Sequence, residues 1–374
     1  MRIKSQLFLG PMSKNLVDAC IKLAKRRKKK IFLIASRRQI ETKLLGGGYV
    51  NNWTTEKISK YVKNKNIILC RDHGGPWQGS YEINKKQNFK EAMIRAKRSY
   101  LQDIKNDFKI LHIDTSLSPK KKLSFNSKIK RLKNLYEYCY RAAKKYRKKI
   151  SFEVGWESEN GEMHNIQELK KFISHLNKFC RTKKITKPKY ITLKTGTKVF
   201  EDKNIGVLFK NYNKKSIFEK KFLHLKKCID ICHRNDFLVK EHNSDYLNYN
   251  FLKLRPSLKI DGVNIAPELG TYETKIIFKL LKKKKLKNLY SDLVNLLVNS
   301  KKWIKWTNPK SKISNEKKAL LAGHYMFNDK NFLKIKMKLN KLLIKSSGIT
   351  LDKYIQNQLQ KKIKLIAKSL NLNY

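Results

Sequence analysis

The sequence contains few acidic residues, no C-x-x-C pair and no long apolar run. Its 29 Asp and Glu stand against 87 Lys and Arg, which gives a formal net charge of +58 over 374 residues. The longest clean apolar stretch, Ile31 to Ala35, is far too short to cross a bilayer. No hydrophobic segment of secretory type precedes Gly10 and Pro11. These absences argue against a membrane protein and predict a cytoplasmic one.

The cysteines are spread through apolar patterns, which is typical of reduced and mostly buried thiols. Cys228 and Cys232 would share one face of a helix, four residues apart. Phe222, Leu225 and Ile229 lie on or beside that face, so core packing is favoured over metal binding. The other cysteines are Cys20, Cys70, Cys139 and Cys180.

The positive charge by itself would favour a nucleic acid or an acidic membrane as partner. The excess is nearly all lysine, however, and it is interleaved with Asn and Ile along the whole chain. RGG repeats, a basic tail, a zinc finger and a recognisable RNA-binding signature are all missing. Uniform enrichment of this kind also follows from an A/T-rich coding sequence. We therefore expect no specific nucleic-acid partner and no membrane partner, and a nucleic-acid-binding protein remains the less favoured alternative.

Short runs of β-branched and aromatic residues alternate with stretches of helical period, as in repeated βα units around a parallel sheet. The number of such runs, about eight, is that of a (β/α)8 TIM barrel. The predicted strands are Gln6 to Leu9, Ile31 to Ala35, Asn66 to Cys70, Ile110 to Ile113, Ser151 to Val154, Tyr190 to Leu193, Phe237 to Val239 and Leu258 to Val263.

Strand signals stop after about Thr271, and helical patterns continue from there. No repeat of solenoid period is present, and no Gly- or Pro-rich linker divides the chain. The sequence therefore predicts a barrel over residues 1–275 and a helical extension packed on it over residues 276–374. The aromatic residues of this extension fit a contact with either the barrel or a partner subunit; they are Trp303, Trp306, His324 and Tyr325.

Polar side chains follow nearly every predicted strand, at the barrel end where active sites of this fold are built. Polar residues at strand ends often only cap loops, but their recurrence after so many strands favours a site. The candidates are Arg37 and Arg38, Asp72 and His73, Glu153, Gly196 and Lys198, Glu241 and His242, Ser244 and Asp245, and Asn264.

These residue types fit metal-assisted chemistry on a phosphorylated sugar. Imidazole nitrogens hold a divalent ion, and a neighbouring carboxylate moves protons. Glycine amides, arginine and lysine hold phosphate. Arg37, Arg38 and Lys198 are the candidate cations for that role.

Four segments resemble blocks of the non-catalytic subunit family of tagatose-bisphosphate aldolase, in the same order and with similar spacing. DHxGP and EHxxDY are specific when they occur together in this order. The segments are GGGYVNNWTTEKI (Gly46 to Ile58), IILCRDHGGPWQ (Ile67 to Gln78), LHIDTSLS (Leu111 to Ser118) and EHNSDY (Glu241 to Tyr246).

The family is similar in turn to the class II fructose- and tagatose-bisphosphate aldolases, in which zinc polarises a ketone. The resemblance implies that Asp72 transfers a proton and that His73 and His242 are zinc ligands. It also implies that Asn264 binds substrate and that Glu153 matches a glutamate of the fifth strand. Gly196, Ser244 and Asp245 complete the expected substrate- and phosphate-binding set.

The sequence departs from the catalytic relatives after the sixth strand. Where those enzymes have a further histidine ligand, this chain has Lys198, and a protonated lysine repels a dication. Glu241 is a further candidate ligand. The first hypothesis is therefore an accessory subunit that assists a catalytic paralogue, within an oligomer, in cleaving tagatose 1,6-bisphosphate to glycerone phosphate and glyceraldehyde 3-phosphate. The alternative is a stand-alone metal-dependent lyase, isomerase or epimerase acting on another sugar phosphate.

Overall fold

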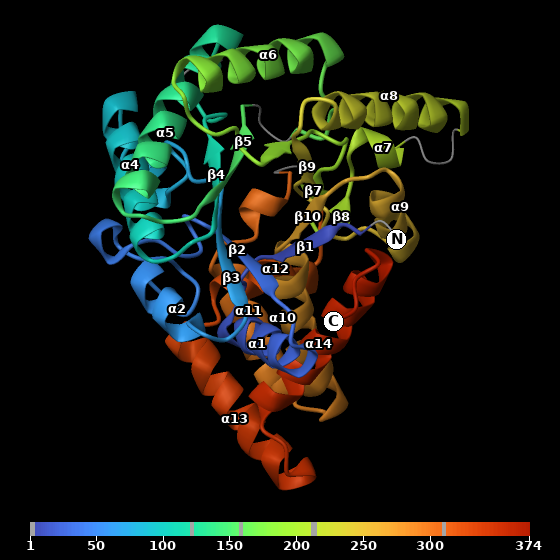
Figure 1. Ribbon diagram of the computed structural model, residues 1–374. Helices are drawn as coiled ribbons and strands as arrows, with labels where there is room; N and C mark the ends of the chain where they lie inside the picture. Colours follow the sequence, from blue (N-terminus) through green and yellow to red (C-terminus); the bar gives the residue numbers. More distant parts are fainter. Residues whose placement is uncertain (1–3, 120–122, 157–159, 211–214, 309–311) are drawn as a thin grey trace.

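The chain folds as a closed barrel of parallel strands with helices outside it (Figure 1), which confirms the predicted (β/α)8 barrel. The computed structural model describes residues 4–119, 123–156, 160–210, 215–308 and 312–374. Around the barrel the strand order is β1-β10-β9-β6-β5-β4-β3-β2. The barrel strands are β1 (Gln6–Leu9), β2 (Ile31–Ser36), β3 (Ile67–Asp72), β4 (Ile110–Asp114), β5 (Ser151–Gly155), β6 (Tyr190–Thr192), β9 (Leu238–Glu241) and β10 (Gly262–Ile265).

The predicted strands all lie where the barrel strands are, but several of the real strands extend further toward their carboxyl ends. Ser36 pairs with Asp72, and Asp114 pairs with Gly155, so these polar ends belong to the ladder. A short antiparallel hairpin after β6 was not predicted; it consists of β7 (Val199–Phe200) and β8 (Lys203–Asn204).

The helices between the strands pack an apolar stripe on the barrel. In α1, for example, the side chain of Ser13 accepts a hydrogen bond from Leu16 N at the first turn, and the buried face includes Leu16, Cys20 and Leu23. The elements of this layer are α1 (Lys14–Arg27), η1 (Lys43–Leu45), α2 (Thr55–Val62), α3 (Ser80–Asn84), α4 (Phe89–Lys105), α5 (Phe125–Lys145), α6 (Ile166–Thr182), α7 (Val207–Lys210), α8 (Lys215–His233) and α9 (Tyr249–Ser257).

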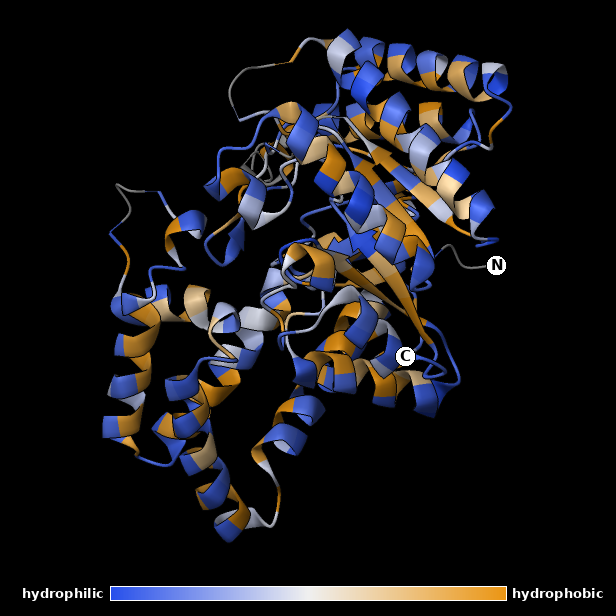
Figure 2. Cartoon of the chain, turned by 90° about the vertical axis from the view of Figure 1, so that its left-hand side faces the viewer, coloured by the Kyte–Doolittle hydropathy of each residue, from blue (hydrophilic) through white to orange (hydrophobic). Residues whose placement is uncertain are grey.

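Helices alone follow the eighth strand, as far as the structure describes this part of the chain. Helix α10 runs across position 275, because it closes the last βα unit of the barrel; the expected division between 275 and 276 therefore falls inside a helix. The elements are α10 (Pro267–Lys283), α11 (Lys287–Asn299), η2 (Ile304–Trp306), α12 (Asn315–Ala322), η3 (Gly323–Tyr325), α13 (Lys330–Ser347) and α14 (Leu351–Ser369). Figure 2 shows that these helices carry both hydrophilic and hydrophobic residues, whereas the barrel strands are largely hydrophobic.

Aromatic residues of the extension contact the barrel within the same chain. The Tyr325 ring centroid lies 4.8 Å from that of Tyr49, and the His324 ring is 3.9 Å from that of Tyr325. Trp306 packs edge-on against His324. This intramolecular contact holds η2 and η3 of the extension near the loop that follows β2.

All six cysteines are buried free thiols, as expected. Burial raises the pKa of Cys228 to about 11 and that of Cys232 to about 12, so both stay protonated near neutral pH. Among the described residues, none of the helices is both long enough and apolar enough for a membrane span.

Candidate metal centre at the carboxyl end of the barrel

The barrel interior is stacked in layers, because every second residue of a strand points inward. The lowest layer is apolar, with Phe8, Ile34, Cys70, Ile110 and Tyr190 packed together. Two residues further along the same strands, the inward positions become polar. The next positions are Asp72 on β3, His112 on β4, Thr192 on β6 and Lys240 on β9, and His242 follows directly after β9.

A buried ion pair forms the floor of this polar region. Lys240 Nζ lies 2.6 Å from Glu153 Oε2, and both side chains are fully buried. The ammonium also lies 3.9 Å from the ring centroid of Phe8 in the layer below. Burial by itself would raise the pKa of Glu153. Lys240 and the neighbouring histidines outweigh that effect and hold the pKa of Glu153 well below its usual range. Glu153 is therefore an anion, and it acts from beneath the site.

Glu153 fixes the orientation and the tautomer of His242. Its Oε1 lies 2.6 Å from His242 Nε2 and accepts a second hydrogen bond from Thr192 Oγ1 at 2.8 Å. Because an ionised carboxylate only accepts, His242 Nε2 carries the proton of this hydrogen bond. A neutral His242 ring consequently keeps its lone pair on Nδ1, which faces the cavity.

His73 is held in the same way from the other side. Its Nδ1 lies 2.6 Å from Asp114 Oδ2, which also accepts from Gln78 Nε2. Burial would raise the pKa of Asp114, but the hydrogen bond and charge of His73 lower it below its usual range. His73 itself has a φ of 42°, in the left-handed region that non-glycine residues seldom adopt. In a neutral His73 ring this hydrogen bond keeps the proton on Nδ1, and the Nε2 lone pair is then directed toward His242.

Close backbone approach explains the two glycines that follow His73. A Cβ on Gly74 would lie 2.3 Å from the ring of Tyr100, and one on Gly75 would lie 1.5 Å from Asp114 O. A side chain at Gly75 would push the loop away from β4, and one at Gly74 would collide with Tyr100 on α4. The DHGG segment is therefore required to keep His73 beside Asp114.

Asp72 and Asn264 complete the wall of the site. Asn264 Nδ2 on β10 donates to Asp72 Oδ1 on β3 at 3.3 Å, although β1 and β2 lie between these two strands in the barrel wall. Asn264 Oδ1 is buried without a hydrogen-bond partner among the described residues. A buried amide oxygen of this kind points to a ligand that donates to it.

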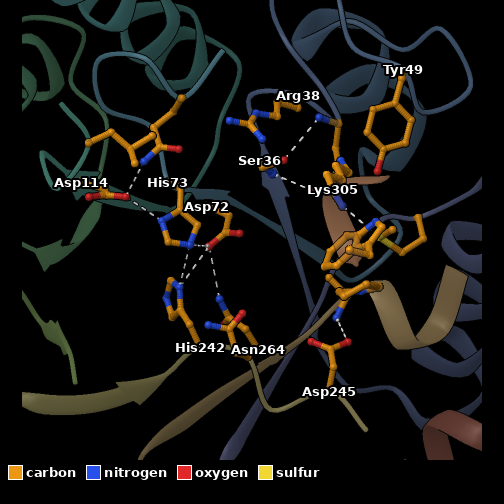
Figure 3. Close-up of a pocket in the computed structure, with 18 of the residues that line it drawn as sticks. Ser36, Arg38, Tyr49, Asp72, His73, Asp114, His242, Asp245, Asn264 and Lys305 are labelled. Atoms are coloured by element: carbon orange, nitrogen blue, oxygen red, sulfur yellow. Dashed lines mark hydrogen bonds and ion pairs between the residues drawn. The ribbon is translucent and has the colours of Figure 1, made fainter. Parts of the chain in front are cut away.

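The cluster has the composition and spacing of a metal site (Figure 3). Figure 3 shows Asp72, His73 and His242 close together. One ligand atom from each of Asp72, His73, His112 and His242 lies within 4.8 Å of all the others. His242 Nδ1 and His73 Nε2 lie 3.0 Å apart, and Asp72 Oδ1 lies 3.6 Å from the first of them. In neutral rings these atoms are all acceptors, which repel one another unless a cation or an additional proton lies among them. Two nitrogen ligands of a tetrahedral zinc ion are about 3.3 Å apart, so the residues present fit this metal.

His112 is the member of the cluster that sequence reasoning missed. Its Nδ1 accepts a long hydrogen bond from the His73 backbone N–H at 3.3 Å, and its Nε2 lies 3.2 Å from Thr192 Oγ1. Burial lowers the pKa of His112 to about 4, with the neighbouring charges as smaller influences, so the ring is neutral near pH 7. The available signal was its position two residues before Asp114 in a strand, where both side chains must share the inward face.

The structure does not bring several predicted residues into this site. Arg37 is buried between Glu41 and Glu82, at 2.6 Å and 2.5 Å. Glu241 pairs with the buried Arg255 and accepts from Ser244 Oγ, which leaves neither Glu241 nor Ser244 directed at the histidines. Each of these groups has the expected chemistry but is occupied by a structural partner.

Gly196 and Lys198 lie in the segment around the β7–β8 hairpin rather than at the metal cluster. The Lys198 side chain is exposed, and its backbone N–H donates to Asn204 Oδ1. Gly196 has a φ of 79°, which is left-handed backbone that favours glycine. Neither residue lines the cavity described next.

A cavity of about 440 Å³ opens above the cluster. Of the predicted residues, those that line it are Arg38, Asp72, His73, His242, Asp245 and Asn264. Asp245 Oδ1 accepts from Ala266 N and Glu268 N at the start of α10, and burial together with the charge of Glu268 raises its pKa to about 8. The opposite wall includes Tyr49, Lys305 and Tyr325.

No protein-family model matches the chain, and no curated protein matches its sequence significantly. A solved structure described as a probable tagatose 6 phosphate kinase from Sinorhizobium meliloti 1021 has a TM-score of 0.67 at 15% identity, covering 98% of this chain and 97% of that one. The YdjI aldolase from Escherichia coli K12 has a TM-score of 0.48 at 12% identity, and the match covers 97% of this chain and 91% of that one. Fructose-bisphosphate aldolase from Campylobacter jejuni has a TM-score of 0.48 at 13% identity, and the match covers 99% of this chain and 90% of that one. At these identities the first similarity establishes a shared barrel fold.

Proposed function

We propose that this chain is a zinc-dependent carbon–carbon lyase of the sugar-phosphate aldolase type. The observation that supports it is the pair of facing ring nitrogens, His73 Nε2 and His242 Nδ1, which lie 3.0 Å apart with His112 beside them. These three residues would hold the ion, since catalytic zinc commonly has three protein ligands and one open position. When bound there, zinc would polarise a substrate carbonyl.

The residues around the cluster have separate roles in this proposal. Asp72, which is 20% exposed in its side chain and faces the cavity, would move a proton at the substrate carbon. The buried Asn264 Oδ1 would accept a hydrogen bond from a substrate hydroxyl. Glu153 and Asp114 would orient His242 and His73 from behind, as carboxylates do for zinc-bound histidines.

A phosphorylated sugar is the proposed substrate class. The sequence resembles tagatose-bisphosphate aldolase subunits, and the name of the Sinorhizobium meliloti protein also refers to a sugar phosphate. The accessory subunit, acting with a catalytic paralogue in a cytoplasmic oligomer, was expected because Lys198 replaces the ligand after the sixth strand. His112 on β4 offers a third nitrogen in its place, which favours a chain that is catalytic by itself.

Measuring metal binding and sugar-phosphate cleavage on the same protein distinguishes a catalytic chain from an accessory subunit. The purified full-length chain is stripped with a chelator, reloaded with Zn²⁺ or Co²⁺, and assayed with tagatose 1,6-bisphosphate and fructose 1,6-bisphosphate by coupled detection of glycerone phosphate. We expect about one ion per chain and zinc-dependent product. His112→Ala should lose the ion and the intense visible spectrum of tetrahedral Co²⁺. His175→Ala on α6, far from the cluster in sequence and fold, is the matched control and should retain both.

Two outcomes would contradict the proposal. Stoichiometric metal without cleavage, followed by stimulation of an added catalytic aldolase, would establish the accessory role. Failure to bind any divalent ion, in protein that is folded by circular dichroism, would remove the metal centre.

A further inference from the structure

The cavity has a second end with the opposite charge. In Figure 3, Lys305 and Tyr49 lie on the other side of the view from Asp114 and His73, with Arg38 above the space between them. Arg38 comes from the turn after β2, and Lys305 comes from η2 in the extension. Both line the same cavity of about 440 Å³ as the histidines. The barrel and the extension therefore each contribute one cation to this end.

Arg38 differs from every buried arginine around it. Arg37, Arg71 and Arg255 are each buried and each bonded to a carboxylate. Arg38 is only half-buried, and within the described ranges no carboxylate lies within ion-pair distance of it. Its backbone is nevertheless fixed, because Tyr49 N donates to Arg38 O at 3.1 Å. The backbone of Arg38 is thus held at the cavity, and no described carboxylate neutralises its guanidinium.

Lys305 is likewise positioned by rings instead of by an acid. Its Nζ lies 3.9 Å from the ring centroid of Tyr325 and 5.4 Å from that of Trp306. Tyr325 in turn packs on Tyr49. Across the described part of the chain, no Asp or Glu oxygen forms an ion pair with this ammonium. Cation–π contact of this kind orients a charge while leaving its hydrogen-bond donors free.

The two cations influence each other electrostatically. Burial lowers the pKa of Lys305 to about 7, with the charges of Arg38 and then Lys302 as smaller causes. Asp245 also lines the cavity, but it is engaged by two backbone N–H groups and its raised pKa keeps it largely protonated near neutral pH. Among the described residues, no ion pair neutralises Arg38 or Lys305 at this end of the cavity.

We propose that Arg38 and Lys305 form a binding site for the dianionic phosphate group of the substrate. The planar guanidinium fork matches two phosphate oxygens, and the ammonium supplies further donors. The identity of the ligand as a phosphorylated sugar rests on the proposed function, whereas the existence of a dianion site does not. The site makes the extension part of substrate recognition: a chain that binds metal normally but lacks Lys305 would lose affinity for phosphorylated ligands.

Phosphate binding to the metal-free protein tests this site independently of zinc. Inorganic phosphate, glycerol 3-phosphate and acetate are titrated by calorimetry at constant ionic strength, because a net charge of +58 attracts anions non-specifically. We expect saturable binding of the two phosphates and none of acetate. Arg38→Met and Lys305→Met should each weaken phosphate binding by roughly tenfold or more, the loss of a charge-assisted hydrogen bond. The double variant should bind none.

Matched variants keep the result interpretable. Lys301→Met removes an exposed lysine from the same segment that does not line the cavity, and it should change phosphate affinity by less than about twofold. Lys305→Arg should restore most of the affinity. Phosphate binding that is unchanged in Arg38→Met and Lys305→Met, or equal binding of acetate, would overturn the inference. Loss of zinc binding with phosphate binding intact would instead count against the proposed function alone.

Discussion

The two ends of the cavity are built on opposite principles. At the histidine end each ring has a carboxylate behind it, with Asp114 on His73 and Glu153 on His242. At the cationic end, Arg38 and Lys305 have backbone and aromatic support but no counter-ion among the described residues. At the histidine end, carboxylates of the protein orient the rings. At the cationic end, a bound anion would have to neutralise the two charges. The difference implies that substitutions at the two ends should separate stability from binding.

The largest effect should come from removing the ammonium under the histidine end. Lys240→Met leaves Glu153 buried without its ion-pair partner, which costs about 3–5 kcal/mol of unfolding free energy in such pairs. Chemical denaturation would measure the loss. The double variant Lys240→Met/Glu153→Gln removes both charges and should recover most of it. If the double variant is as unstable as the single one, the lysine stem contributes through packing and the ion pair does not.

An intermediate effect is expected where a carboxylate orients a ligand. Asp114→Asn should lower zinc affinity by about 10–100-fold, because the amide no longer holds the His73 proton on Nδ1 as firmly. Competition with a chelating dye measures this affinity. Phosphate binding by the same variant should not change. A parallel fall in phosphate affinity would show that the two ends of the cavity are coupled. The two ends could then no longer be treated as independent sites.

A small effect on stability is expected at the cationic end. Arg38→Met and Lys305→Met remove charges without a counter-ion, so each should change the unfolding free energy by less than about 0.5 kcal/mol. Arg37→Met, one residue away, leaves the buried Glu41 and Glu82 without their ion-pair partner. The unfolding free energy should therefore fall several times more than in Arg38→Met. Equal losses at positions 37 and 38 would mean that Arg38 has a structural role.

No measurable effect is expected at Lys198, where the sequence suggested phosphate binding. The side chain is exposed outside the cavity, so Lys198→Met should leave zinc affinity and phosphate affinity within about twofold of the parent values. A clear loss of phosphate affinity in calorimetry would place the anion site at the β7–β8 hairpin and not beside Lys305.

The barrel could be predicted from the sequence because its strands are short apolar runs that contrast with lysine-rich helices. Strand ends were harder, since Asp72 and Asp114 look like loop residues although they continue the parallel ladder. Position in the chain also identified His73 and His242 as neighbours, because both follow strands that end at one rim. His112 was missed because it is surrounded by apolar residues within a strand, where a histidine is usually a core residue.

The remaining errors concern partners that are distant in sequence. Arg37 and Arg38 are identical in type and adjacent, but Arg37 is buried between Glu41 and Glu82 while Arg38 lines the cavity. Lys305 lies in a helical extension without any motif, and its approach to the turn after β2 depends on the packing of Tyr325 on Tyr49. Hydrophobic periodicity describes one helix or strand at a time, so it does not predict contacts between residues that are distant in sequence.

The two ends of the described chain close against each other, and this has a consequence for the timing of synthesis. Ser5 N donates to Leu370 O, Asn15 Nδ2 donates to Asp352 on α14, and β1 pairs with β10. A ribosome adding about 5–20 residues per second needs roughly 20–70 s to make the segment between these partners. Until β10 has been made, Leu7 and Leu9 lack their strand partners Val263 and Ile265. The barrel can therefore close only after β10 has been made.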